Sequence, residues 1–227
     1  MDEAAHIEVL YDALRALPEA TVGEIIDGRL YAQPRPSAVH SDVQLGLGGD
    51  IEAMFDRGRD GPGGWRILTE PEVHFERDVQ VLVPDLAGWR RERMPQLPDD
   101  QRIEIGPDWV CEILSPSTAS KDRETKMPVY ARYGVTHAWI IDPRAKTLEA
   151  FALQAGAWTL AAQFSGDDEI WAPPFRDHGI APPLGLSAGW VSRLSGTPAH
   201  VRPRGHRSIA PTRTRKQRTW NLRRRTH

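Results

Sequence analysis

Two acidic residues lie at or within apolar runs that are typical of buried β-strands. Asp85 follows the run Val79–Val83 and a proline, where a strand would emerge from the core. Glu112 lies inside the mostly apolar run Asp108–Leu114. An ionised carboxylate there must be paired, protonated or bound to a metal, because its burial is otherwise very costly. Mg²⁺ prefers oxygen ligands and is commonly held by one or two carboxylates, water and a substrate phosphate. Two acids on neighbouring strand ends would supply such a site.

Each acid also has a plainer interpretation. Aspartate is frequent in turns, so Asp85 beside Pro84 is also explained as a turn residue. Glu112 is also explained by a buried ion pair with an arginine. A metal site has the advantage that it explains both acids together.

Hydrolysis of a phosphodiester also requires positive charge near the attacking water or the developing negative charge. Lys126 is the candidate, because it follows the strand that carries Glu112. Pro128 is favourable in the first turn of a helix. We therefore predict a helix that begins near Thr125, with Lys126 at its start. Lys121 we interpret as a solvated surface charge.

The elements that must position these residues follow from hydrophobic spacing and turn residues. We predict a helix from Ile7 to Leu17, a hairpin around the Asp-Gly turn at residues 27–28, and a helix capped by Ser37. Strands are predicted at residues 65–69, 72–75, 79–83, 108–114, 137–141, 147–153 and 158–164, with a polar stretch up to residue 107 and a helix that ends near residue 133. This order predicts a mixed α/β sheet flanked by helices, with added β-hairpins.

Composition narrows the class of protein. A chain of 227 residues suits one domain with an appendage better than two full domains. The single cysteine, Cys111, excludes a disulfide framework and a four-cysteine zinc site, and favours a reducing cytoplasm. We find no apolar stretch near the roughly 20 residues needed to span a bilayer and no secretory signal. We therefore expect a cytoplasmic protein without a membrane segment.

The formal net charge of −2 conceals an asymmetry. Residues 201–227 contain ten Lys or Arg side chains and no Asp or Glu, so the other 200 residues carry 19 basic and 31 acidic side chains, about −12. We predict one domain at residues 1–194 and a basic, disordered tail at residues 195–227. The tail is either an arm that binds nucleic acid through its charge or an extension without a selected function.

A set of short motifs links these residues. It consists of Pro84-Asp85, then Glu112-Ile-Leu-Ser-Pro-Ser117, then Asp122-Arg-x-x-Lys126-x-x-x-Tyr130, followed by Gly134, Trp139 and Asp142-Pro143, with Glu24-x-Ile-Asp27-Gly28 and His40 upstream. In these motifs the sequence resembles the Uma-two family of restriction-endonuclease-like proteins. The resemblance covers about residues 21 to 164, and the block that begins at Glu112 is its most specific part.

The resemblance implies the restriction-endonuclease-like fold and a site of the PD-(D/E)XK type. In that site Asp85 and Glu112 would be the metal ligands. Lys126 would be a migrated lysine, because the usual lysine position, two residues after Glu112, is Leu114. Glu24 and His40 are secondary site candidates, and Glu24 would add a ligand or hold a ligand's partner. His40 is equally well explained as a helix-surface or hydrogen-bonded core residue.

Other matching positions receive structural interpretations. We interpret Tyr130, Gly134 and Trp139 as packing and capping residues, and Asp142 as a turn residue. Ser115 and Ser117 are not predicted to be nucleophiles, because the sequence lacks the Gly-x-Ser-x-Gly elbow.

The leading hypothesis is therefore a DNA endonuclease that uses Mg²⁺, with Mn²⁺ as a possible substitute, to hydrolyse phosphodiester bonds. Candidate nucleic-acid contacts are Arg90, Arg91 and Arg93, and analogy with related folds suggests a homodimer. The alternative is a catalytically silent nuclease-like module that binds nucleic acid or protein, since an acidic body is unfavourable for gripping phosphates.

Overall fold

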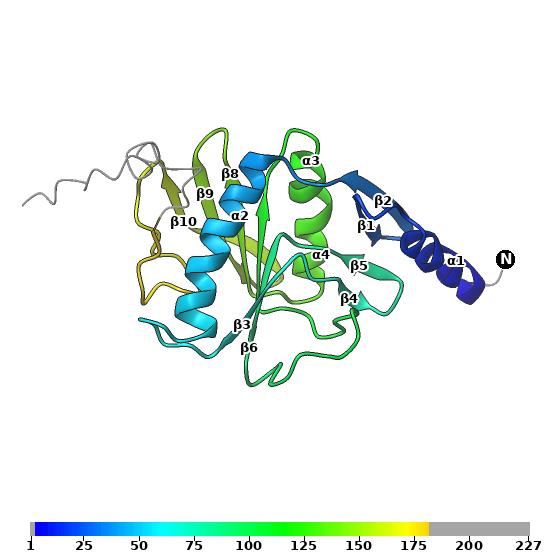
Figure 1. The fold of residues 1–227 in the computed structure, drawn as a ribbon, viewed down its shortest axis with the longest axis horizontal. Helices are drawn as coiled ribbons and strands as arrows, with labels where there is room; N and C mark the ends of the chain where they lie inside the picture. Colours follow the sequence, from blue (N-terminus) through cyan, green and yellow to red (C-terminus); the bar gives the residue numbers. More distant parts are fainter. Residues whose placement is uncertain (1–2, 182–227) are drawn as a thin grey trace, which may run out of the picture.

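The computed structural model describes residues 3–181. Its helices are α1 (Glu3–Arg15), α2 (Ala38–Ile51), α3 (Ala119–Lys121) and α4 (Met127–Arg132), with π-helical turns η1 (Glu52–Asp56) and η2 (Asp122–Lys126). Its strands are β1 (Thr21–Ile26), β2 (Arg29–Pro34), β3 (Trp65–Thr69), β4 (Val73–Glu76), β5 (Gln80–Leu82), β6 (Leu86–Arg90), β7 (Trp109–Ile113), β8 (His137–Asp142), β9 (Thr147–Gln154) and β10 (Ala157–Ser165). Figure 1 shows their arrangement.

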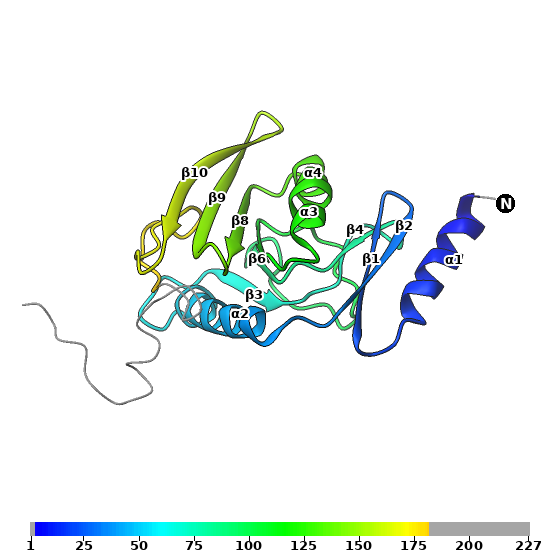
Figure 2. The ribbon, with the colours of Figure 1, turned by 90° about the horizontal axis from the view of Figure 1, so that it is seen from above.

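The main sheet has six strands in the order β10-β9-β8-β7-β6-β3. Its β7–β8 pair is parallel, while the other neighbours are antiparallel, so the predicted mixed sheet is confirmed. Successive side chains along β7 point to opposite faces of the sheet. Cys111 packs in the hydrophobic core that includes residues of α2, and Val110 packs in the core that includes residues of α4. The sheet is thus covered by α2 on one face and by α3 and α4 on the other, as Figure 2 shows. Glu112 shares the face of Val110.

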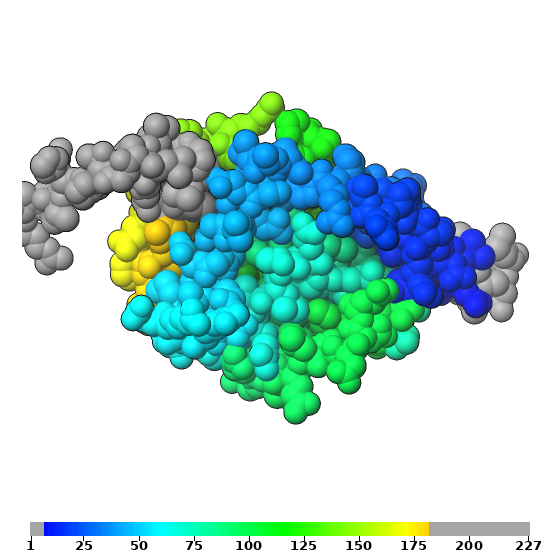
Figure 3. Space-filling view, in the orientation of Figure 1, coloured from blue at the N-terminus to red at the C-terminus, as the bar shows by residue number. Residues whose placement is uncertain are grey.

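A second sheet has the strand order β2-β1-β5-β4. The predicted turn between β1 and β2 is confirmed, since Asp27 (φ 49°) and Gly28 (φ 73°) both adopt the left-handed conformation that a tight hairpin requires. Tyr11 and Leu14 of α1 pack with Ile25 of β1. Figure 3 shows that the blue segment after β2 runs across the surface to α2, so the hairpin and α2 border the same region.

The helix that carries Lys126 begins six residues earlier than the sequence predicts. Ala119 donates its N–H to the Ser115 carbonyl at 3.0 Å, so the turn before it already leads into the helix at Ala119 rather than near Thr125. The N–H of Met127 donates five residues back, to Asp122. Pro128 then lacks an N–H, and the wide turn before it accommodates that loss. Lys126 therefore lies in the middle of a continuous helix and not at its head. Gly134 (φ 75°) ends this helix as predicted.

Strand β6 was not predicted, because its sequence lies in the stretch interpreted as polar. Its register places it between β3 and β7. Gly88, which weakens the strand pattern, is needed there: a Cβ would lie 3.1 Å from both Ile67 and Trp109 side chains. Close packing against Ile67 and Trp109 thus explains why this position is a glycine. The same glycine made the strand hard to recognise in the sequence.

The predicted domain boundary and tail are not described by the structure. The boundary near residue 194 and the basic tail at residues 195–227 lie outside the described residues. Among helices within residues 3–181, none has the length and apolar character needed to cross a membrane.

Candidate active site

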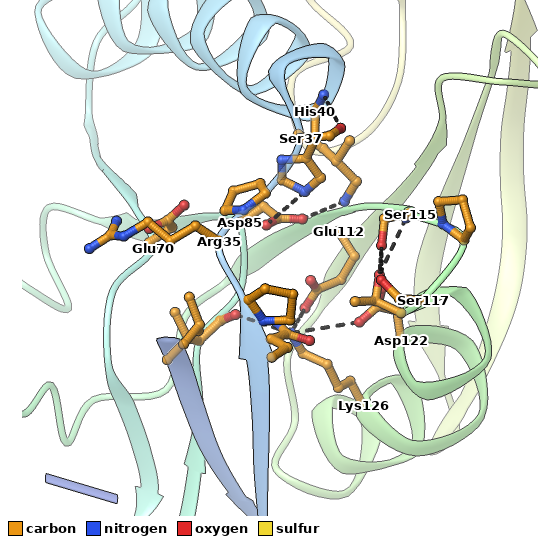
Figure 4. Close-up of a pocket in the computed structure, with 18 residues that line it drawn as sticks. Arg35, Ser37, His40, Glu70, Asp85, Glu112, Ser115, Ser117, Asp122 and Lys126 are labelled. Atoms are coloured by element: carbon orange, nitrogen blue, oxygen red, sulfur yellow. Dashed lines mark hydrogen bonds and ion pairs between the residues drawn. The ribbon is translucent and has the colours of Figure 1, made fainter. Parts of the chain in front are cut away.

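Asp85 and Glu112 lie beside each other on neighbouring strands. The antiparallel register that pairs Leu86 with Cys111 brings Asp85, one residue before β6, opposite Glu112 in β7. The Ile113 N–H donates to Oδ2 of Asp85 at 2.6 Å, which ties the two strand ends together. Figure 4 shows both carboxylates in the same pocket, between α2 and the helix that carries Lys126.

Lys126 lies beside Glu112 in this pocket, and its ammonium group has more partners than expected. Its side chain is 1% exposed, and its Nζ lies 2.8 Å from Oε1 of Glu112 and 2.9 Å from Oε1 of Glu24. It also donates to the Val83 carbonyl at 3.1 Å. Because an ammonium group has three hydrogens to donate, these contacts occupy all of them.

Glu24 comes from β1 and is fully buried. Its Oε1 accepts the Val83 N–H at 2.9 Å in addition to the Lys126 contact. Its Oε2 lies 2.5 Å from Nζ of Lys121, and Lys121 also donates to Gln33 at 2.7 Å. The interpretation of Lys121 as a solvated surface charge is therefore wrong: the hairpin covers it and supplies its partners.

Two further residues of the site were missed. The Tyr130 hydroxyl donates to Oε1 of Glu112, so Tyr130 does more than pack. Asp122 is buried one turn before Lys126, with Oδ1 4.0 Å from its Nζ. The spacing of Asp122 and Lys126, four residues apart in a helix, was the sequence signal that could have identified this acid.

His40 reaches the site from the first turns of α2, where Ser37 caps the helix as predicted and accepts the His40 N–H at 3.3 Å. Nε2 of His40 lies 3.1 Å from Oδ1 of Asp85. Burial lowers the pKa of His40, but the contact with Asp85 outweighs this and leaves the pKa raised. Gln44, one turn on, donates to the Asp85 carbonyl at 2.9 Å and to Glu70 at 3.4 Å. Gln44 and Glu70 were not anticipated.

The buried charges shift one another's pKa values. Burial raises the pKa of Glu112 well above its usual value, and the negative charge of Asp122 adds to this against the effect of Lys126. Burial also raises the pKa of Glu24, but the positive charges of Lys126 and Lys121 outweigh burial, so the pKa of Glu24 is lowered. Burial alone would lower the pKa of Lys126, yet Glu112 and Glu24 raise it. The lysine thus stays charged, while Glu112 is the acid whose ionisation the site opposes.

The site opens into a pocket of about 270 Å³. One wall is the segment from Gln33 to Ser37, and the opposite wall is the turn from Ser115 to Thr118. The Ser115 hydroxyl bonds to those of Ser117 and Thr118, each at 3.0 Å, and no histidine contacts it in the described chain. That the serines are not nucleophiles stays a prediction.

The donor set fits a hard divalent cation. The carboxylates that line the pocket belong to Glu70, Asp85, Glu112 and Asp122, and oxygen donors are what Mg²⁺ prefers. Within residues 3–181 no three His, Cys, Asp or Glu side chains are grouped so that they could hold a metal ion. A cation there would take two protein carboxylates and complete its shell with water and a phosphate, which is common for Mg²⁺.

The three candidate nucleic-acid contacts do not reach this pocket. Arg90 lies at the end of β6 opposite to Asp85, with its guanidinium 4.2 Å from the Trp65 ring centre. Arg91 pairs with Asp56, and Arg93 lies 2.6 Å from Asp108. These arginines are held by neighbours on another part of the molecule.

Comparison with known proteins gives the family of the chain. The model of the Uma2 family, described as "Putative restriction endonuclease", matches residues 11–183. The chain belongs to the Uma2 family. A crystal structure of "a putative nuclease belonging to DUF820" from Anabaena variabilis is similar, with a TM-score of 0.60 and 25% sequence identity. That match covers 76% of this chain and 94% of the other. No curated protein matches the chain.

These findings confirm the family and the fold class that the sequence predicted. Both the Uma2 description and the name of the structural neighbour support a nuclease-like function.

Proposed function

We propose that this Uma2 protein is a Mg²⁺-dependent DNA endonuclease that hydrolyses phosphodiester bonds. The observation that carries the proposal is the meeting of Asp85, Glu112 and Lys126 from three elements in one pocket. Nuclease chemistry requires two carboxylates for a cation and a fixed positive charge, and this pocket contains both.

Asp85 and Glu112 would hold the cation. When bound, the cation supplies Lewis acidity toward a phosphate oxygen and lowers the pKa of bound water. The Ile113 N–H and His40 both contact Asp85, so its carboxylate is oriented before any ligand arrives. Because Glu112 shares its Oε1 with Lys126 and Tyr130, these two side chains set its orientation.

Lys126 would supply the positive charge beside the scissile phosphate or its attacking water. Its three hydrogens are engaged by Glu24, Glu112 and the Val83 carbonyl. To donate to substrate it must loosen one of these bonds, and of the three partners Glu112 and Val83 line the pocket while Glu24 does not.

A direct test uses supercoiled plasmid, Mg²⁺ and the full chain. We expect nicking that stops with EDTA and that falls by at least a hundredfold in Glu112→Gln and Lys126→Met, with folding checked by circular dichroism. Nicking by both variants at the parent's rate would show that the assignment is wrong. Glu104→Gln, which changes an exposed acid paired with Arg77, is the matched control.

The second candidate is a nuclease-like module that binds nucleic acid or protein without cutting. The full engagement of the Lys126 hydrogens favours it, because a lysine so held has no free donor for substrate. Saturable DNA binding without cleavage in either Mg²⁺ or Mn²⁺ would support this function instead.

A further inference from the structure

We infer that Glu24 is a positioning residue of the nuclease site, which fixes both the Lys126 ammonium and the segment that leads into Asp85. The inference rests on the proposed function, because it assigns a role within that site. Glu24 is 0% exposed and, unlike Glu112, does not line the pocket. Any effect on substrate must therefore pass through its neighbours.

The backbone of Val83 is held at both its N–H and its carbonyl. Its N–H donates to Oε1 of Glu24 at 2.9 Å, and its carbonyl accepts from Nζ of Lys126 at 3.1 Å. The contact between Glu24 and Lys126, at 2.9 Å, closes this ring. The two peptide groups that flank the Cα of Val83 are thereby fixed by two buried side chains of opposite charge.

Val83 lies two residues before Asp85. Pro84 stands between them, and its ring restricts the backbone that joins the two residues. A movement of Val83 would therefore be passed on to the Asp85 carboxylate. Glu24 thus acts on a proposed ligand and on the proposed catalytic lysine at the same time.

The second oxygen of Glu24 is anchored separately. Oε2 lies 2.5 Å from Nζ of Lys121, which in turn bonds to Gln33 of β2 at 2.7 Å. The anchor links the β1–β2 hairpin to the helix that carries both lysines. Since each carboxylate oxygen of Glu24 already contacts an ammonium group, Glu24 serves to hold side chains in place and is not itself a metal ligand.

The experiment compares the Mn²⁺ affinity of three variants of the full chain. Mn²⁺ is titrated into each variant, and electron paramagnetic resonance measures the free Mn²⁺. Glu24→Gln keeps the volume and an acceptor for the Val83 N–H but removes the charge. We expect it to weaken Mn²⁺ binding about tenfold or more, as is usual when a group supporting a ligand is changed. Lys121→Met should act in the same direction with a smaller effect. Glu72→Gln, which changes an acid bonded to Tyr11 and His74, should bind Mn²⁺ like the parent.

Cleavage kinetics and nuclear magnetic resonance give further readouts. In Glu24→Gln we expect kcat to fall at least tenfold while KM for DNA stays within twofold, because Glu24 does not touch substrate. In metal-free protein the Lys126 ammonium signal and the Val83 and Asp85 amide signals should shift in Glu24→Gln, but not in Glu72→Gln.

The outcomes separate the inference from the proposed function. If the parent binds Mn²⁺ but cuts no DNA, the proposed function fails, and the Mn²⁺ comparison still decides the role of Glu24. If the parent binds no Mn²⁺, the Lys126 and Asp85 signals decide whether Glu24 holds them. Parent-like Mn²⁺ affinity and kcat in folded Glu24→Gln would overturn the inference, as would a loss of stability alone. Should Glu24→Gln fail to fold, the same criteria apply to Lys121→Met.

Discussion

Nζ of Lys126 lies 2.8 Å from Oε1 of Glu112, and the two side chains are 1% and 2% exposed. Two opposite charges buried this deeply stabilise each other only while both are present, because removal of one leaves the other without compensation. The same pair is the centre of the proposed nuclease site. Its contribution to stability and its contribution to catalysis must therefore be measured separately.

Lys126→Met should lower the free energy of unfolding by about 3–5 kcal/mol at pH 7, because Glu24 and Glu112 lose the buried cation that they share. Urea denaturation measures this change. The double variant Lys126→Met/Glu112→Gln should recover part of the loss, since it removes one of the two stranded acids as well. Purely additive effects of the two substitutions would argue against the pairing seen in the structure.

Glu112→Gln should make stability less dependent on pH. Burial raises the pKa of Glu112 above 4.5, so the folded protein keeps this proton to a higher pH than the unfolded chain does. As pH rises above 4.5, unfolding releases a proton, and the stability that protonated Glu112 contributes is lost, at up to about 1.4 kcal/mol per pH unit. Denaturation from pH 4.5 to 8 should therefore show the parent falling relative to Glu112→Gln. A parent that instead gains stability relative to Glu112→Gln over this range would contradict the raised pKa.

Mn²⁺ should raise the melting temperature of the parent protein. A ligand that binds only the folded state adds about 2.7 kcal/mol at a concentration a hundred times its Kd. Asp85→Asn and Glu112→Gln should each remove most of this shift, because each loses one of two carboxylate ligands. Scanning calorimetry with and without EDTA makes the comparison, and an undiminished shift in both variants would place the cation elsewhere.

His40→Ala should weaken Mn²⁺ binding less than Asp85→Asn does. The Asp85 carboxylate loses its contact with His40 at 3.1 Å but keeps the bond from the Ile113 N–H. Supporting groups of this kind typically change metal affinity by about 10–100-fold, and we expect the lower end here. Calorimetric titration measures the affinity. A loss as large as that of Asp85→Asn would indicate that His40 itself contacts the cation.

Substitution of Arg91 or Arg93 by alanine should leave plasmid cleavage unchanged within twofold. Arg91 pairs with Asp56 and Arg93 with Asp108, away from the pocket. Each change should cost no more than about 1 kcal/mol of stability, as is usual for partly exposed ion pairs. Filter-binding and nicking assays test this expectation. A marked loss of DNA affinity would support Arg91 and Arg93 as nucleic-acid contacts.

The sequence alone predicted that Asp85 and Glu112 belong to one site, and it predicted much of the framework around them. Glu112 stood out because a charge inside an apolar strand requires a partner, and this reason needs no structure. The Asp-Gly turn and the Ser37 cap were recognisable because their geometry depends on local residue types. Strand β6 was missed because Gly88 is explained by its neighbours Ile67 and Trp109, which are far from it in the sequence.

Only the tertiary structure decided the partners of the two lysines. Lys121 and Glu24 are 97 residues apart in the chain, yet their charged groups lie 2.5 Å apart once the hairpin packs against the helix. The sequence shows that a lysine is present, but its burial and its contacts depend on which segments cover it. Helix periodicity could suggest that Asp122 lies near Lys126, whereas the ring of Glu24, Lys126 and Val83 required the pairing of β1 with β5 and the packing of the helix against that sheet.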